Sequence, residues 1–175
     1  MKITVDVLSK ESIEAAIKAV EAFGEKVKKL ETELPKALAE FGKVQARAEY
    51  DWAPYNLFWD NTWDDTPSIS VRAEQTDKGW SVIANGEEVC FLEFGAGVFF
   101  EQAGNVYQGT RPPGVVGIGE YGYGLGKNEL WSFEKGGAKQ WTHGTPPSNA
   151  LYHTAEEIKR RVEETARRIL NDDRH

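Results

Sequence analysis

The sequence lacks cysteine pairs that could form disulfides and long apolar runs that could span a membrane. Only one of its 175 residues, Cys90, is a cysteine, so no disulfide can form within the chain. No apolar run approaches the roughly 20 residues that span a bilayer, and the first residues, MKITVDVLSKE, lack the apolar stretch of a secretory leader. We therefore expect a soluble single domain, residues 1–175, that folds in a reducing cytoplasm on its own core.

An excess of positive charge is also missing. The net charge is −7, and the whole excess falls in residues 51–145, which hold thirteen acidic and six basic residues. The same stretch contains all six tryptophans and fifteen of the seventeen glycines. Proteins that bind nucleic acid through its phosphates need clustered Lys and Arg, so this class is disfavoured.

A long amphipathic helix is predicted over residues 10–50, where apolar side chains recur at helical spacing. Ser9 or Ser12 is the expected N-cap. Pro35 lies within the pattern and is expected either to kink the helix or to open a second one.

A second amphipathic helix is predicted over residues 148–171, again from the spacing of its apolar residues. Ser148 is the more natural N-cap, and Thr154 with Glu157 is the alternative, as a capping box.

Between the helices, residues 68–94 predict an antiparallel β-meander. The turn Asn85-Gly86 is the strongest short hairpin signal, because both of its residues must adopt positive φ. The predicted strands are SISVRAE (68–74), Trp80–Ala84 and Val89–Phe94. The expected fold class is therefore α+β, with the meander packed against both helices.

Two segments carry little periodicity. Residues 55–67 (YNLFWDNTWDDTP) form an acidic and aromatic loop, and residues 95–145 form a long arm with thirteen glycines and a short strand at Leu130–Phe133. Segments this long without regular structure are usually functional in compact domains.

Glu93 lies in the apolar run CFLEFGAGV (90–98) and is the main candidate for a catalytic residue. A buried glutamate can act as a general acid, with a second carboxylate from residues 60–65 or from Glu101. The interpretation that we favour is a structural ion pair with Arg72 or Arg111.

Two loop motifs are incomplete. Gly117–Gly122 matches G-x-G-x-x-G, but Pro112-Pro113 precedes it and further glycines follow it, where a dinucleotide site needs a strand and a helix. Asp60, Thr62 and Asp64 have the spacing that opens a calcium loop, without the later glycine and glutamate of that motif. We predict neither a cofactor nor a metal site from them.

The candidate soft ligands and nucleophiles are Cys90, His143 and His153. They lack the paired spacing of zinc sites, and Cys90 is expected to be a small buried hydrophobic residue. No catalytic, cofactor-binding or metal-binding residue is therefore predicted.

A cluster of aromatic and acidic residues surrounds the predicted loop. Trp52, Trp59 and Trp63 lie near Asp60 and the pair Asp64-Asp65. This mixture is found on sugar-binding surfaces and also in protein–protein hot spots. The alternative function is therefore a small carbohydrate-binding or glycan-cleaving domain that uses Glu93 and this loop.

Three strings together resemble the tail-completion (neck) proteins of long-tailed phages. One is the long helix that runs into Ala53-Pro54 and is followed by a strand. The others are ANGEEVCFLEFGAGV (84–98) and WTHGTPPSNALYHTAEE (141–157). The resemblance spans about residues 10–170, but the family usually follows its Ala-Pro with a Thr-Gly-x-Leu turn, where this chain has YNLFW (55–59).

The resemblance implies a structural protein of the virion and no enzyme. Such proteins are expected to assemble as a ring, six-fold like the tail tube, at the head–tail junction. The implied partners are connector or head-closure proteins and tail-terminator or tail-tube proteins, with DNA only as passing cargo and no membrane. We expect the arm (95–145) and the loop (55–67) to carry these contacts.

Overall fold

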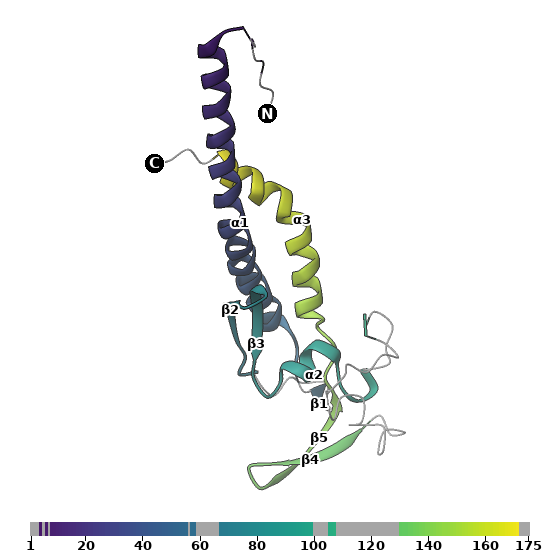
Figure 1. Cartoon of the computed structure of the whole chain (residues 1–175). Coiled ribbons are helices and arrows are strands. Elements are labelled where there is room, and N and C mark those ends of the chain that lie inside the picture. The colour runs from purple at the N-terminus through teal and green to yellow at the C-terminus, as the bar shows by residue number, and fades with distance from the viewer. Residues whose placement is uncertain are drawn as a thin grey trace.

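The computed structural model describes residues 4, 6, 8–55, 57–58, 67–99, 105–107 and 130–171. The molecule is elongated, with two long helices side by side and a small sheet at the end opposite the N-terminus (Figure 1). In chain order its elements are α1 (Lys10–Trp52), β1 (Leu57–Phe58), β2 (Ser70–Thr76), β3 (Gly79–Asn85), α2 (Val89–Phe94), the 3-10 helix η1 (Gly97–Phe99), β4 (Trp131–Lys135), β5 (Ala138–Gly144) and α3 (Ala150–Asn171). The α+β fold with a long helix near each end is confirmed.

The helix α1 is one continuous helix, and Pro35 lies inside it. Its N-cap is Ser9, whose hydroxyl accepts a hydrogen bond from the backbone N–H of Ser12 at 3.2 Å. Proline removes one intrahelical hydrogen bond, so packing along the rest of α1 must compensate for it. None of the helices in the described ranges is long and apolar enough to cross a membrane.

The strands β2 and β3 form an antiparallel hairpin, in register from Ser70 opposite Asn85 to Thr76 opposite Gly79. This confirms the first two predicted strands. The prediction of a third strand over Val89–Phe94 was wrong, because these residues form α2. A six-residue run that is apolar except for Glu93 suits a strand and a buried helix turn equally well, so the contacts elsewhere in the fold decide between them.

A second sheet has the order β1-β5-β4, with all pairs antiparallel. The strand β4 confirms the strand expected near Leu130–Phe133. Neither β5 nor β1 was predicted, and β1 lies within the predicted loop 55–67. The β4–β5 turn consists of Gly136 and Gly137, with φ of 60° and 77°. Two successive residues with positive φ match the right-handed twist of a hairpin, which is why glycines stand there.

The core lies where α1, α2, α3 and the β2–β3 hairpin meet. Its buried members are Tyr50 of α1, Leu92 of α2, Ala150 of α3 and Ile69, which directly precedes β2. Partly buried side chains pack around them, namely Ala53, Tyr55, Val71, Ala84, Val89 and Leu151. The predicted meander is thus replaced by a hairpin and a short helix around the same core.

Gly42 allows α1 to approach its neighbours closely. A Cβ atom at this position would lie 2.6 Å from Ile158 Cδ1 on α3 and 2.8 Å from Val82 Cγ2 on β3. Gly24 lies in the same helix, and nothing lies within 4 Å of the corresponding position there. The two glycines therefore differ in packing but not in secondary structure.

We expect Gly42→Ala to lower the free energy of unfolding by about 1–3 kcal/mol, because the added methyl overpacks the α1–α3 contact. Gly24→Ala is the matched control and should raise stability by up to about 1 kcal/mol through helix propensity. Urea denaturation followed by circular dichroism measures both variants. Equal stabilisation by both would contradict the close packing at Gly42.

Candidate functional site: the Glu93 junction

The helix α2 is joined to the segment that leads into α3. The carbonyl of Leu92 accepts hydrogen bonds from the backbone N–H and the hydroxyl of Ser148, at 2.6 and 3.0 Å. The carbonyl of Glu93 accepts from the backbone N–H of Asn149 at 3.3 Å. The last carbonyls of a helix have no partner within it, so residues 148 and 149 satisfy two of them.

The connection continues one step beyond α2. Ala96 and Thr145 exchange both backbone hydrogen bonds, at 2.8 and 3.3 Å. Between these contacts Gly95 has φ 77°, and a Cβ atom there would lie 2.9 Å from Pro147 Cδ. Glycine is required at this position both by its backbone conformation and by the proline ring.

The side chain of Glu93 lies at the centre of this junction and is only 2% exposed. Its Oε2 accepts from the hydroxyl of Tyr50 at 3.1 Å and from the N–H of Leu151 at 2.9 Å. Its Oε1 accepts from the hydroxyl of Tyr107 at 3.0 Å and from the N–H of Tyr152 at 3.2 Å. A carboxylate has about four acceptor positions, so all of them are occupied.

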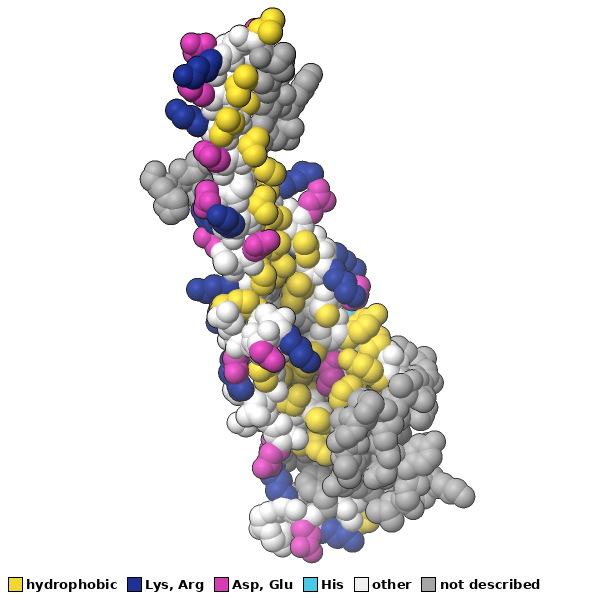
Figure 2. All heavy atoms as spheres, viewed as in Figure 1, with side chains coloured by type: hydrophobic (Ala, Val, Ile, Leu, Met, Phe, Trp, Pro, Cys, Tyr) yellow, Lys and Arg dark blue, Asp and Glu magenta, His cyan; other side chains and the backbone are white. Residues whose placement is uncertain are grey.

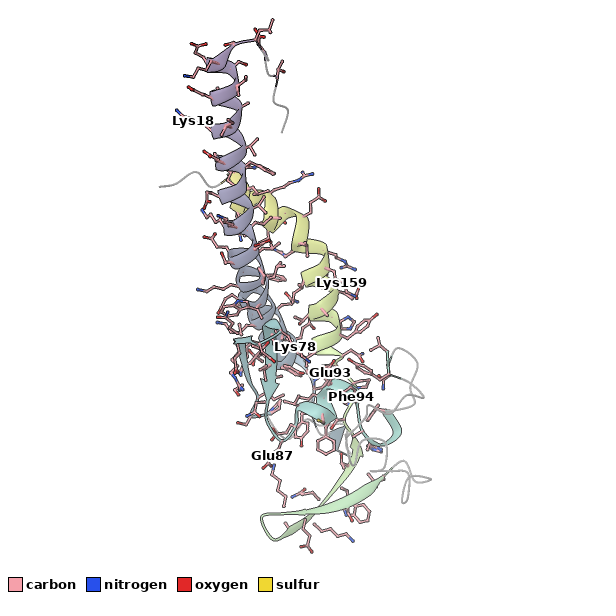
Figure 3. All side chains as sticks on the ribbon, in the orientation of Figure 1. Lys18, Lys78, Glu87, Glu93, Phe94 and Lys159 are labelled. Carbon is pink, nitrogen blue, oxygen red and sulfur yellow. The ribbon has the colours of Figure 1, made fainter. Side chains whose placement is uncertain are left out.

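The carboxylate of Glu93 caps the N-terminus of α3, although Glu93 lies in another part of the chain. The N–H groups of Leu151 and Tyr152 belong to the first turn of α3, where intrahelical acceptors are lacking. A negative charge at this end is also favoured by the helix dipole. Figure 3 shows Glu93 and Phe94 beside the start of α3.

The predicted local caps of α3 are not formed. The hydroxyl of Ser148 donates a hydrogen bond to the carbonyl of Leu92. Asn149, the residue before α3, has φ 51°. The side-chain oxygens of Asn149 and Thr154 are buried, and neither has a hydrogen-bond partner in the described part of the chain. Neither Ser148 nor the Thr154–Glu157 capping box therefore begins the helix.

The two tyrosines have altered acidity. Burial of the hydroxyl and then the negative charge of Glu93 raise the pKa of Tyr50 above its ordinary value. The same two causes, in the same order, raise the pKa of Tyr107. Both hydroxyls therefore stay protonated and keep donating to the carboxylate.

Aromatic rings enclose the junction on the side of Tyr107. Its ring meets that of Phe94 edge to face, with centroids 4.6 Å apart, and that of Tyr152 at 6.5 Å. The amide of Asn105 donates to the carbonyl of Phe94 at 2.9 Å. Residues 105–107 are thus bound to α2 although they belong to the predicted arm.

The expected ion pair of Glu93 with Arg72 was wrong, because Arg72 pairs with Glu74 on its own strand at 2.8 Å. The other arginine considered, Arg111, lies outside the described residues. A general acid needs an oxygen that can reach a substrate, whereas both oxygens of Glu93 are enclosed and already accept two hydrogen bonds each. The geometry therefore favours a structural role for this carboxylate.

The remaining candidate residues are dispersed. Cys90 lies in α2 and is partly buried, His143 lies in β5, and His153 lies in α3. In the ranges that the structure describes, no group of three or more His, Cys, Asp or Glu residues is arranged to hold a metal ion.

Of the aromatic and acidic cluster, Trp52 is 89% exposed at the end of α1. The other residues of that cluster, at 59–65, lie outside the described ranges, together with Glu101 and Gly117–Gly122.

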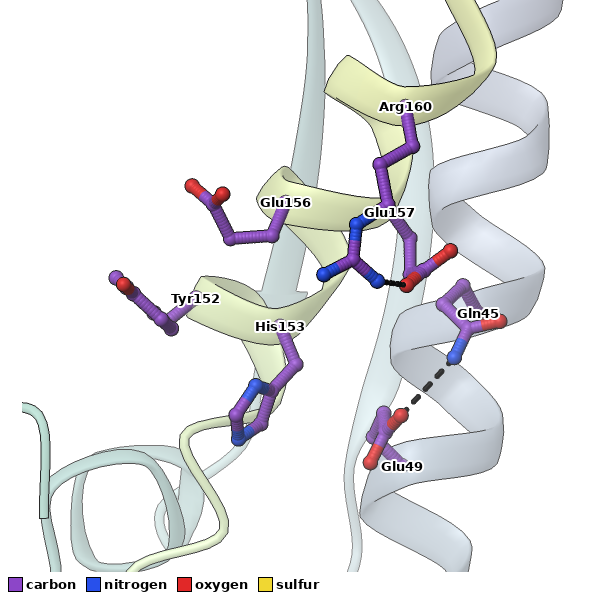
Figure 4. A pocket seen from close by; sticks show the side chains of 7 residues that line it. All are labelled: Gln45, Glu49, Tyr152, His153, Glu156, Glu157 and Arg160. Carbon is purple, nitrogen blue, oxygen red and sulfur yellow. Dashed lines mark hydrogen bonds and ion pairs between the residues drawn. The ribbon is translucent and has the colours of Figure 1, made fainter. Parts of the chain in front are cut away.

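A groove of about 630 Å³ runs between α1 and α3 above the junction (Figure 4). Its lining residues are Gln45, Glu49, Tyr152, His153, Glu156, Glu157 and Arg160. Gln45 donates to Glu49 at 2.9 Å, and Arg160 pairs with Glu157. Ligand pockets are mostly apolar and enclosed, so this charged groove does not have the character of one.

Comparison of the chain with protein-family models, curated proteins and solved structures finds no match.

Glu93→Gln should destabilise the protein. The new amide group points a donor at hydroxyl and N–H groups that are themselves donors, at a cost of about 1–3 kcal/mol for each buried group left without an acceptor. The matched control is Glu87→Gln, at an exposed position just before α2. Chemical denaturation of both variants tests this, and equal stability would show that the junction does not depend on the carboxylate.

The free energy of unfolding should fall as the pH rises above about 10, the ordinary pKa of tyrosine. The folded state raises the pKa of Tyr50, so the unfolded chain loses this proton first, and stability decreases with pH in that range. In Tyr50→Phe the slope of the free energy of unfolding against pH should be less steep by about 1.4 kcal/mol per pH unit. Urea denaturation at several alkaline pH values measures it, and parallel curves for the two proteins would contradict the assignment.

Proposed function

We propose that this chain is a structural protein of a phage virion, which acts at the head–tail junction through protein–protein contacts in an oligomeric ring. The observation that carries the proposal is the contact between two of the three strings on which the family resemblance depends, residues 84–98 and 141–157. Residues 84–98 contribute Glu93, and residues 141–157 contribute the backbone N–H groups that bind it. Because these two strings form one structural unit, the resemblance has a physical basis.

The character of the Glu93 junction supports a role in assembly over catalysis. Its carboxylate connects α1, α2, α3 and residues 105–107, and all its acceptor positions are used. The carboxylate therefore has a structural function, which is to hold these parts of the chain together. For the alternative, a glycan-cleaving or carbohydrate-binding domain, the exposed Trp52 is the feature in favour, but the enclosed Glu93 has no access to a sugar.

Charge is consistent with a protein that surrounds passing DNA. The excess of acidic residues in 51–145 repels phosphate, so DNA can move past without binding. The partners in this proposal are neighbouring copies, connector or head-closure proteins, and tail-terminator or tail-tube proteins. The location is the virion, and the host cytoplasm during assembly.

Disruption of the gene in the genome that encodes this chain should abolish infectious particles while heads and tails still form. Electron microscopy of lysates should show filled heads and tails that are not joined, or tails with aberrant ends. Supplying the intact chain from a plasmid should restore joined particles and is the control. Normal yields of joined particles without the chain would rule the proposal out.

A further inference from the structure

The first part of α1 projects beyond the rest of the molecule. The helix α3 runs antiparallel to α1, and its Leu170 carbonyl accepts from Lys26 Nζ at 3.3 Å, so α3 ends beside this residue. Residues 10–25 of α1 lie past that point (Figure 1). At 1.5 Å per residue they extend for about 24 Å.

One face of the projecting segment is apolar and exposed, and its residues follow a heptad pattern. We call Ile13, Ala16, Val20, Phe23 and Val27 the N-terminal stripe; their spacings alternate between three and four, as at positions a and d of a coiled coil. The large side chains of the stripe are between 36% and 59% exposed. Figure 2 shows the stripe as a line of hydrophobic side chains along the upper helix.

The N-terminal stripe continues the face of α1 on which α3 packs. The a positions run from Ile13 in steps of seven to Phe41, which contacts Arg161 of α3 with 4.3 Å between the guanidinium carbon and the ring centroid. Gly42, next to it, is in close contact with Ile158. The same helix face is therefore covered by a helix along its second half and exposed along its first half.

The charges around the stripe exclude two kinds of partner. Residues 10–25 contain both signs, as Lys10, Glu11, Glu14, Lys18, Glu21 and Glu25. Helices that bind nucleic acid or an anionic membrane surface have a polar face rich in Lys and Arg, which this one lacks. An apolar protein surface of similar length is the partner that fits.

The positions that flank the stripe are compatible with a second copy of the same helix. In coiled coils the e and g positions of one helix meet those of its partner, and like charges there prevent pairing. Along the stripe these positions are Lys10, Ser12, Ile17, Ala19, Gly24 and Lys26, and only the two at its ends are charged. Between these ends identical helices can approach without charge repulsion, and Ile17, 52% exposed, widens the apolar surface.

We propose that the N-terminal stripe packs against the N-terminal stripe of a neighbouring copy of this chain, with the two helices parallel. The parallel direction follows from the rotational symmetry of a ring, which orients neighbouring copies alike. In this respect the inference rests on the proposed ring.

Site-specific disulfides test this arrangement in the full chain. Cys90 is first replaced by Ala, and a single cysteine is then introduced as Ile13→Cys or Val20→Cys. Parallel stripes bring each new thiol close to its counterpart, within the reach of a disulfide. The control is Lys18→Cys, on the opposite side of α1 (Figure 3).

Under mild oxidation the two stripe variants should form covalent dimers on a non-reducing gel, and Lys18→Cys should not. Native mass spectrometry should show that the chain without an introduced cysteine is oligomeric, and that Val20→Glu shifts it to monomer while Lys18→Glu does not. Circular dichroism verifies that both charged variants remain helical.

Other results would overturn the proposal. Disulfides at Val20→Cys but not at Ile13→Cys would mean antiparallel helices. A monomeric chain would contradict the contact, as would binding of that monomer to vesicles of anionic phospholipid. Rings whose stripe variants do not cross-link would refute this inference and leave the proposed function intact, whereas stripe cross-links in a chain that is dispensable for particle assembly would refute the function alone.

Discussion

The carboxylate of Glu93 is the interaction on which the rest of the structure depends. A buried negative charge is costly unless it is fully hydrogen-bonded, and here two tyrosine hydroxyls and two backbone N–H groups meet that requirement. These donors come from α1, from residues 105–107 and from the start of α3. One side chain thereby fixes how the two long helices and the short helix α2 are oriented at this end of the molecule.

The parts of the fold that sequence could predict are those with local signals. Both long helices have apolar stripes that continue over several turns, and β2 alternates apolar and polar residues. The error at Val89–Phe94 arose because a run of six residues, apolar except for Glu93, is too short to show a period. The strand β5 was missed because AKQWTHG has no alternation, although Gly136-Gly137 before it is a recognisable hairpin turn.

The junction itself could be predicted only in part. The sequence drew attention to Glu93 as a glutamate within an apolar run, which was correct for its burial. Its partners could not be identified in this way, because Tyr50 and Leu151 are 43 and 58 residues distant and backbone N–H groups have no sequence signature. Arginine was the natural guess for a buried acid, since acidic residues are almost never fully buried unless they are paired.

The helix α1 combines two environments in one continuous element. Its second half is enclosed by α3 and the β2–β3 hairpin, where Gly42 permits close contact. Its first half presents the same apolar face to solvent, beyond the point where α3 ends. In the proposed ring this division separates the part of the helix that builds the subunit from the part that meets the next subunit.

The wide separation of the Glu93 contacts in sequence also bears on how the chain folds. The helices and hairpins close short loops and can form early. The carboxylate of Glu93, in contrast, contacts Tyr50, Leu151 and Tyr152, which are 43, 58 and 59 positions away from it in the sequence. Closing such long loops costs chain entropy before any contact is gained, and non-local contacts of this kind slow folding. We therefore expect the start of α3 to acquire its cap late in folding. Until then the carboxylate does not connect residues 84–98 with residues 141–157.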